Sequence, residues 1–333
     1  MSKRLKNIVC LGGGTGTSMV LSGLKKYPLD LTAVVTMFDN GGSSGKLRKE
    51  LGVLPFGDIR QCLVSLARKS SLIDFFNYRF KTGALKGHNL GNLLITAASQ
   101  TGENIEKGID KIGSILDVKG KVLPVTLENT NIMAVLKNNQ KISGEDNIVK
   151  FRYLSKIGIK KLFLEPKVKV NPGVISAIKK ADLIIIGPGK FYTSIISNFL
   201  IKEVPQAIKK ARAKKVFVCN LMTQTGNTDN FKAEDFIKIL EKYLGRKTID
   251  YVVFNIGKLS KEQLKEVKKV FPGANFIKYD ESLLKKKNFI GADLLDKNIR
   301  KLNSADSLVE GANRRTMILH NSVKLAKIIL SLI

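Results

Sequence analysis

The sequence has few of the residues that build metal and disulfide sites. It contains no tryptophan, two histidines and three cysteines in 333 residues. Cys10, Cys62 and Cys219 lie far apart in apolar surroundings, and none belongs to a Cys-x-x-Cys pair. Because disulfide frameworks need paired cysteines and zinc sites need clustered cysteine or histidine ligands, we expect neither in this chain.

A long hydrophobic run is also missing. No segment reaches the roughly 18 consecutive apolar residues that a membrane-spanning helix needs. The first six residues are mostly polar or basic and lead directly into a predicted strand, without the apolar stretch of a signal peptide. We therefore expect a cytoplasmic protein with no membrane span.

Acidic residues are scarce relative to basic ones. The chain has 28 Asp and Glu against 57 Lys and Arg, which gives a formal net charge of +29. Most of the excess is lysine, spread over predicted helices such as 202–215 and 258–269. Nucleic-acid-binding proteins instead gather basic residues on one face and interleave aromatics, so we expect no specific nucleic-acid partner. Nonspecific binding of a polyanion or a membrane surface stays open, and the positive field would attract anionic metabolites.

The order of apolar runs predicts an α/β fold. Hydrophobic residues make up 44% of the chain, as in an average globular protein with a packed core. Strands that alternate with helices pair in parallel, which favours a Rossmann-like, doubly wound and mostly parallel sheet. The predicted strands are 7–11, 31–37, 182–186, 215–219 and 250–255, and the helices between the later strands are 176–181, 204–213 and 233–244.

Three segments are predicted to add to this body within a single domain of residues 1–333. Helical periodicity from 57 to 115 predicts a helical layer or insertion. Residues 120–150 contain a strand signal followed by a hairpin signal, which predicts a small β addition. Apolar residues at helical spacing within 319–333 predict a C-terminal helix that docks on the body.

A glycine-rich turn follows the first predicted strand and opens a helix. It matches the dinucleotide-binding fingerprint at its first two glycines only, because Thr17 stands where the third is expected. Glycines still let the backbone approach a phosphate, and the free N–H groups at the start of the helix bind one. The pattern favours phosphate or nucleotide binding by Gly13, Gly14, Thr15, Gly16 and Thr17 over a purely structural turn.

The loop after the second predicted strand is rich in glycine, and we expect it to be irregular. Ser43, Ser44 and Arg48 combine two hydroxyls with a cation, which suits an oxyanion better than a solvent loop. Asp39 stands where an acid often holds a ribose, but it also fits a loop cap or a place near a metal ion. The neighbouring amide of Asn40 completes this candidate set.

Later loops supply further candidates for the same crevice, because the carboxyl ends of parallel strands converge. Asp58 is the candidate N-cap of a helix, and the segment before a second helix contains one of the two histidines. For this histidine a structural role and a binding role are equally supported. The candidate phosphate- or nucleotide-binding residues here are His88, Asn92, Gly187, Gly189, Lys190, Tyr192, Thr193, Ser194, Asn220, Thr223 and Gln224.

Seven ordered segments together resemble a known family. They are LGGGTGTS, FDNGGSSGKLRKELG, GDIRQCLVSLA, GHNLGN, GEDNI, ADLIIIGPGKFYTS and VCNLMTQTGNT. In this order they resemble the gluconeogenesis factor family (YvcK), which is related to the 2-phospholactate transferases (CofD). The resemblance covers about residues 7 to 255 and is weaker beyond them.

The resemblance implies a Rossmann-like fold whose crevice binds UDP-sugars, notably UDP-N-acetylglucosamine. It implies a regulator of carbon flow between gluconeogenesis and cell-wall synthesis that is needed for morphogenesis. In the transferase branch it implies an enzyme that uses a guanine nucleotide donor and a deazaflavin acceptor, so whether this chain has activity stays open. Asp39, Ser43, Ser44, Gly187 and Gly189 would inherit the ligand contacts. We also expect a homo-oligomer.

Three positions depart from the family pattern. Asn40 stands where the family has a second aspartate, and Mg²⁺ prefers carboxylate oxygens, so we assign no metal ligand and keep Asp39 and Asp58 as the only candidates for Mg²⁺. Lys190 replaces a serine, and its cation either strengthens pyrophosphate binding or replaces a metal. Leu319-His320-Asn321 replaces an Arg-His-Asp segment, which weakens the expectation of sugar contacts from the tail.

Overall fold

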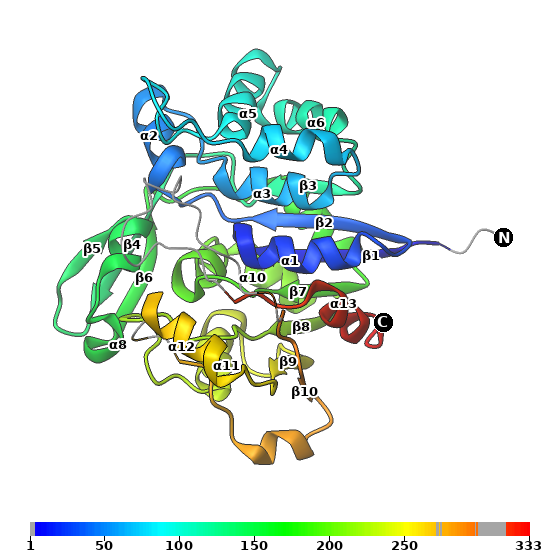
Figure 1. Cartoon of the computed structure of the whole chain (residues 1–333), viewed down its shortest axis with the longest axis vertical. Coiled ribbons are helices and arrows are strands. Elements are labelled where there is room, and N and C mark those ends of the chain that lie inside the picture. The colour runs from blue at the N-terminus through cyan, green and yellow to red at the C-terminus, as the bar shows by residue number, and fades with distance from the viewer. Residues whose placement is uncertain (1–3, 271–272, 274, 297, 299–317) are drawn as a thin grey trace.

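A parallel sheet of seven strands forms the centre of the structure, a computed structural model that describes residues 4–270, 273, 275–296, 298 and 318–333 (Figure 1). The strand order is β10-β9-β8-β7-β1-β2-β3, and every pairing is parallel. This confirms the predicted α/β class. The strands are β1 (Lys6–Gly12), β2 (Leu29–Val35), β3 (Lys121–Pro124), β7 (Leu183–Ile186), β8 (Lys214–Val218), β9 (Tyr251–Asn255) and β10 (Phe289–Ala292).

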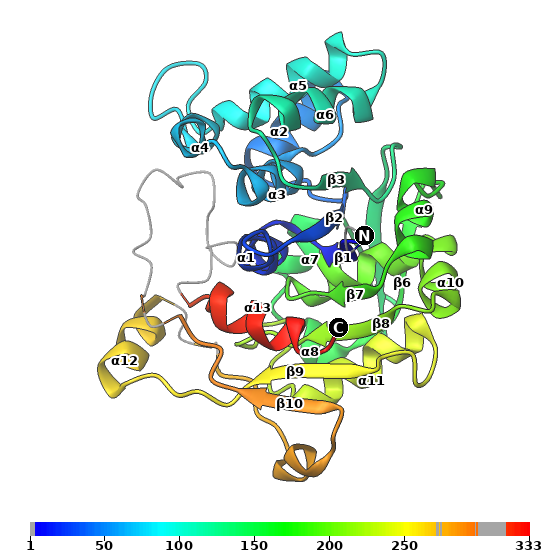
Figure 2. The ribbon, with the colours of Figure 1, turned by 90° about the vertical axis from the view of Figure 1, so that its right-hand side faces the viewer.

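Helices cover both faces of this sheet, which explains the continuous apolar runs of its central strands. Helix α1 (Gly14–Leu24) and α13 (Ser322–Leu330) lie on one side, and α9 (Pro172–Lys180), α10 (Glu203–Lys210) and α11 (Ala233–Leu244) lie on the other (Figure 2). All four residues of β7 are buried between them. The five strands predicted from apolar runs are all present within two residues of their predicted bounds.

A group of helices lies beyond β2 and β3, at the top of Figure 1. It includes α2 (Gly42–Leu51), which begins inside the loop that we expected to be irregular. That expectation was wrong because Leu47 gives the segment a buried position and Gly52, at φ +68°, ends it as a left-handed cap. The others are α3 (Gly57–Leu66), α4 (Ile73–Asn77), α5 (Leu90–Thr101) and α6 (Ile105–Ile115), with a short 3₁₀ turn at Ser70–Leu72.

A second, antiparallel sheet contains β4 (Asn131–Leu136), β5 (Lys141–Ser143) and β6 (Ile159–Glu165) in the order β5-β4-β6. The predicted hairpin is therefore confirmed as β4 and β5, but the predicted bounds of 120–150 do not match the sheet that contains it. The first strand of the predicted addition, β3, pairs with β2 in the main sheet, and the third strand of the antiparallel sheet, β6, lies beyond residue 150. Lys160 and Lys161 interrupt the apolar alternation of β6, which hid this strand in the sequence.

The remaining elements complete the chain around these sheets. In the described residues, no helix is long and apolar enough to cross a membrane. The remaining elements are α7 (Glu145–Lys150), α8 (Leu154–Ile157), α12 (Lys261–Val270), a π-helical turn at Phe191–Ile195, and 3₁₀ turns at Ile196–Leu200 and Glu281–Lys285.

The predicted C-terminal helix is present as α13, and it packs against α1. Gly23 of α1 makes this close approach possible, because a Cβ atom at this position would overlap the backbone carbonyl of Ser322. Asn321 starts α13 by accepting hydrogen bonds from the N–H groups of Val323 and Lys324. The contact ties the end of the chain to the first helix.

Replacing Gly23 with alanine should lower the free energy of unfolding by about 1–3 kcal/mol, because the overlap forces the two helices apart. Gly113 in α6 is the matched control, since a Cβ there meets no atom nearer than 3.8 Å. Gly113→Ala should instead raise the free energy of unfolding by about 0.5–1 kcal/mol, as expected for a helix interior. Urea unfolding of both variants measures the difference, and equal shifts would contradict the role of Gly23.

Candidate functional site

The strand order reverses at β1, which lies between β2 and β7. In doubly wound sheets, ligands bind outside the carboxyl ends of the strands at such a reversal. The loops that follow β1, β2, β7 and β8 emerge at this edge, and they carry most of the residues predicted from the sequence. The sheet topology therefore brings the candidate loops together.

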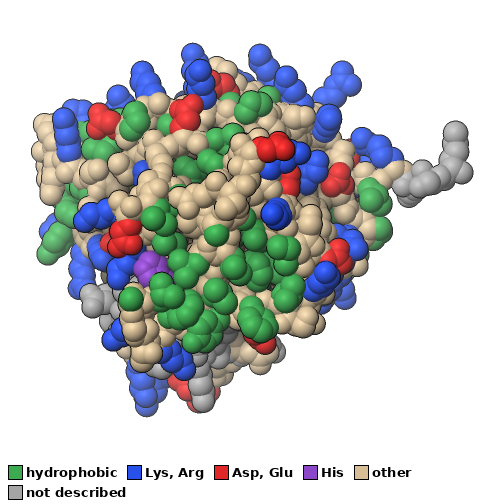
Figure 3. Space-filling view, turned by 90° about the horizontal axis from the view of Figure 1, so that it is seen from above, with side chains coloured by type: hydrophobic (Ala, Val, Ile, Leu, Met, Phe, Trp, Pro, Cys, Tyr) green, Lys and Arg blue, Asp and Glu red, His purple; other side chains and the backbone are tan. Residues whose placement is uncertain are grey.

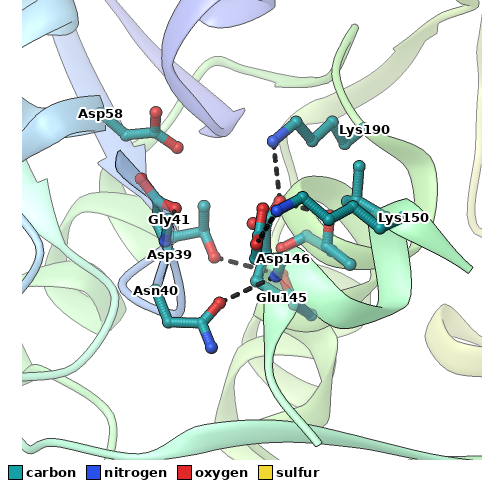
Figure 4. A network of polar contacts seen from close by, with 12 residues as sticks. Asp39, Asn40, Gly41, Asp58, Glu145, Asp146, Lys150 and Lys190 are labelled. Atoms are coloured by element: carbon teal, nitrogen blue, oxygen red, sulfur yellow. Dashed lines mark hydrogen bonds and ion pairs between the residues drawn. The ribbon is translucent and has the colours of Figure 1, made fainter. Parts of the chain in front are cut away.

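Four charged side chains gather at this edge: Asp39, Asp58, Glu145 and Lys190 (Figure 4). Asp39 follows β2, Asp58 lies in the first turn of α3, Glu145 begins α7 and Lys190 follows β7. Glu145 is buried and the other three are half-buried. Lys190 Nζ donates to Glu145 Oε1 at 2.8 Å. We call these four residues the charged cluster.

The members of the charged cluster shift one another's protonation. Burial raises the pKa of Asp39 to about 7, and the charges of Glu145 and Asp58 add to this effect. Burial likewise raises the pKa of Asp58. For Lys190, burial acts to lower the pKa, but the carboxylates of the cluster outweigh it and raise the pKa above its usual value. Lys190 is therefore charged at neutral pH.

The glycine turn before α1 faces a carboxylate of the protein itself. The N–H group of Gly14 donates to Asp58, and Gln61 Nε2 donates to Asp58 Oδ1 at 3.4 Å. Thr15 Oγ1 in turn donates to Gln61 Oε1 at 2.8 Å. Asp58 is not the N-cap that we expected, because α3 begins at Gly57 and Phe56 precedes it. The positive end of α1 therefore already stabilises an anionic group.

The glycine turn and the loop after β7 pack directly on each other. A Cβ atom at Gly16 would overlap the carbonyl oxygen of Pro188, and one at Gly13 would lie 2.7 Å from Ser194 Oγ. Asn220 fixes the second loop, because its Nδ2 donates to the carbonyl of Gly189 at 2.7 Å and its Oδ1 accepts from the N–H of Gly189 at 3.3 Å. Close packing thus requires glycine at position 16, whether or not a phosphate binds.

The hydroxyl of Ser43 joins the first turns of α2 and α5. It accepts hydrogen bonds from Asn89 N and Asn92 Nδ2, both at 3.3 Å, and pairs with His88 Nδ1 at 3.2 Å. Arg60 Nε donates to Asn92 Oδ1 at 3.0 Å. Burial lowers the pKa of His88, which favours a neutral ring. Three predicted site residues therefore meet in one buried network, the Ser43 junction.

Other predicted residues contact the protein rather than the charged cluster. Thr223 Oγ1 donates to the carbonyl of Asn275 at 3.3 Å, and Gln224 N donates to Thr228 Oγ1 at 2.8 Å. Asn40 Oδ1 accepts from the N–H of Asp146 at 2.8 Å, which ties the loop after β2 to α7. Tyr192 lies near Tyr243 and Asp235 of α11. Ser44 Oγ lies against Gly57, where Asp39 Oδ2 of the charged cluster is also a neighbour.

Sequence reasoning missed Glu145, which accepts hydrogen bonds from both Lys190 and Thr193. Its segment, Gly144-Glu145-Asp146, contributed to the family resemblance but not to the predicted site. Acids at the start of a helix are common because of the helix dipole, so the sequence alone did not distinguish a buried site residue from an ordinary first turn. Its low exposure, 3%, is the signal that identifies it.

The charged cluster does not fit Mg²⁺ while Lys190 is in place. Across the part of the chain that the structure describes, no three acidic, histidine or cysteine side chains are placed to hold one metal ion. The ammonium of Lys190 takes one oxygen of Glu145 and points toward the space in front of Asp39 and Asp58 (Figure 4). We therefore assign no binding step to a divalent cation.

The free energy of unfolding should fall as the pH rises from about 4 to about 7, because of Asp39. Its folded pKa of about 7 lies above the ordinary value of 3.8, so the folded chain binds more protons than the unfolded chain in this window. The slope is at most about 1.4 kcal/mol per pH unit for one group. Asp39→Asn should flatten the slope, whereas Asp74→Asn on the exposed side of α4 serves as the control. Urea unfolding at several pH values tests this, and an unchanged slope in Asp39→Asn would contradict it.

Comparisons with known proteins agree with this architecture. The model of the family described as 2-phospho-L-lactate transferase CofD matches residues 8–295. The chain is 41% identical over 329 residues to the "Putative gluconeogenesis factor" of Clostridium acetobutylicum, which covers 98% of this chain and 69% of that protein. It is also 41% identical over 268 residues to the "Gluconeogenesis factor" of Listeria innocua, with 79% and 82% covered.

A solved structure supports the same assignment. A member of the UPF0052 family from Bacillus halodurans shares 34% identity with this chain at a TM-score of 0.86, and the match covers 99% of this chain and 100% of that one. Fold, sequence and family model therefore agree over most of the described residues. This chain belongs to the CofD family, and its relatives there include proteins named gluconeogenesis factor.

Proposed function

We propose that this protein is a cytoplasmic regulator that binds a nucleotide sugar, of the UDP-N-acetylglucosamine type, at the carboxyl edge of the main sheet. One observation carries the proposal. Six buried side-chain polar atoms of the described residues have no hydrogen-bond partner, and three of them belong to this site: Thr17 Oγ1, Arg48 Nη1 and Glu145 Oε2. Buried polar atoms are nearly always paired in native proteins, so these three support a ligand that moves nearby side chains aside when it binds, because solvent does not reach them in the described structure.

The chemistry of the site matches a ligand with both phosphates and sugar hydroxyls. Lys190 and Arg48 supply cations, which form strong charge-assisted hydrogen bonds with phosphate oxygens. Asp39 supplies a carboxylate that accepts hydrogen bonds from ribose or hexose hydroxyls. The charge of Asp39 also acts to raise the pKa of Arg48, against the larger effect of burial. These two side chains therefore interact electrostatically across the loop after β2.

The role in carbon flow and morphogenesis rests on relatives rather than on geometry. Proteins at about 40% identity carry the name gluconeogenesis factor, and this supports a regulator of gluconeogenesis. The uridine base, the acetylated sugar and the connection to cell-wall synthesis come from the family resemblance. The net charge of +29 favours an anionic ligand of any kind.

Binding without turnover is favoured because the candidate nucleophiles are occupied or inactive. Burial raises the pKa of Cys10 and of Cys219 to about 12 and raises that of Cys62 as well, so these thiols are protonated at neutral pH. The Ser43 hydroxyl is held by three hydrogen-bond partners in its junction. The site therefore presents binding groups without an activated nucleophile.

A transferase is the second candidate, favoured by the CofD family match over residues 8–295. Such an enzyme would form a phosphodiester bond between a phospholactyl group and a deazaflavin hydroxyl and would release GMP from the guanine nucleotide donor. No side-chain nucleophile is needed if the acceptor hydroxyl attacks directly, with Asp39 or Asp58 taking its proton. GMP release that requires both donor and acceptor would establish this function in place of the regulator.

A nonspecific polyanion adaptor has less support. On the face in Figure 3, Lys and Arg side chains are scattered around the rim among Asp and Glu instead of forming one continuous basic patch. If the protein binds a polyanion and this binding is lost at moderate salt, the binding is nonspecific and driven by counterion release.

Calorimetric titration with UDP-N-acetylglucosamine, GDP and NAD, each with and without Mg²⁺, tests the proposal directly. Saturable binding that prefers the UDP-sugar supports the regulator. Tighter binding of GDP that depends on Mg²⁺ would contradict it and favour the transferase.

Arg48→Met should weaken UDP-N-acetylglucosamine binding by about tenfold or more, since a charge-assisted hydrogen bond contributes about 1.5–3 kcal/mol. Arg246→Met, in the exposed segment after α11, is the matched control and should bind as the wild type does. Thermal unfolding checks that both variants fold. Wild-type affinity in Arg48→Met would remove this residue from the site.

A further inference from the structure

We propose that Lys190 acts as a cation built into the site and does there what a divalent metal ion would otherwise do. The inference rests on the proposed function, because it concerns how the same crevice accepts a diphosphate. It begins from the position of Lys190, which reaches from the loop after β7 toward carboxylates on three other elements (Figure 4).

The positive charge of Lys190 stabilises the charged cluster. Without Lys190, the positive charges left beside these carboxylates are Arg48, which interacts with Asp39, and Arg60, which interacts with Asp58. Glu145 would lose the ammonium that holds it, and carboxylates that share a partly buried site repel one another strongly. Lys190 holds Glu145 directly at 2.8 Å, and its charge favours the ionised forms of Asp39 and Asp58. The chain therefore supplies by a covalently attached side chain what a bound ion could supply from solution.

The same ammonium is placed to bind a phosphate. A lysine has three N–H donors, and Lys190 uses one for Glu145. Its side chain remains 41% exposed, so the other donors can reach a ligand in the crevice. In sites that bind nucleotides through Mg²⁺, the ion connects carboxylates to phosphate oxygens. Lys190 makes that connection between Glu145 and the ligand without a metal.

Two consequences follow for the intact protein. Ligand affinity should not depend on Mg²⁺, and the carboxylates should become a metal site only when the ammonium is removed. They must then turn toward one another, because in the described residues no three acidic side chains are placed to hold one ion. Lys190→Ser creates that situation, because it deletes the cation and adds a small oxygen group. Lys150→Ser is the control, since it deletes an exposed lysine of α7 that pairs with Asp146 at 2.7 Å.

The first measurement titrates Mn²⁺ alone into the full-length wild type, Lys190→Ser and Lys150→Ser, with electron paramagnetic resonance to count bound ions. We expect one bound ion per chain in Lys190→Ser and at least tenfold weaker binding in the other two proteins. Equal Mn²⁺ binding in all three, or none in a folded Lys190→Ser, would overturn the proposal. This measurement needs no nucleotide, so it gives an answer even if the proposed function fails.

The second measurement repeats the UDP-N-acetylglucosamine titration with Mg²⁺ and with EDTA. Wild-type affinity should change less than about twofold between the two conditions, whereas Lys190→Ser should lose about tenfold or more in EDTA and recover with Mg²⁺. A wild type that binds only with Mg²⁺ would overturn the proposal. Lys190→Arg, which keeps a cation, should stay independent of Mg²⁺, and circular dichroism confirms that each variant folds.

Discussion

The parallel pairing of β1 with both β2 and β7 is the constraint on which the site depends. These pairings set the register of three buried strands, and the register decides where each following loop emerges. Because the strand order reverses at β1, loops that lie far apart in the sequence become neighbours. Gly16 packs directly against Pro188 where two of these loops meet, and the charged cluster lies at the same edge.

The charged cluster works against stability and is maintained by its surroundings. Removing a carboxylate from water costs several kcal/mol unless a charge or hydrogen bonds compensate. Glu145 is compensated by Lys190 and Thr193, and Asp58 by Gly14 and Gln61, whereas Asp39 keeps a strongly raised pKa. Natural proteins tolerate such arrangements mainly at functional sites. The incomplete compensation of Asp39 is thus the physical reason to regard this edge as functional.

Local patterns in the sequence were sufficient for five of the seven strands of the main sheet and for the two glycine loops. Continuous apolar runs identified the strands because both sheet faces are covered, and glycines marked the turns that pack closely. The start of α2 was missed because glycines and serines carry no helical periodicity, although Leu47 supplies the buried position. Glu145 and the final position of Asp58 depend on contacts between distant segments. No local pattern contains that information, so the composition of the cluster required the structure.

The Ser43 junction also determines how the loop after β2 can respond to a ligand. One hydroxyl holds the beginnings of two helices, so α2 cannot shift without breaking its bonds to His88, Asn89 and Asn92 together. Hydrogen bonds in such a network strengthen one another, so losing one weakens the others. The first turns of α2 and α5 are thereby tied to the loop after β2 through a single oxygen atom.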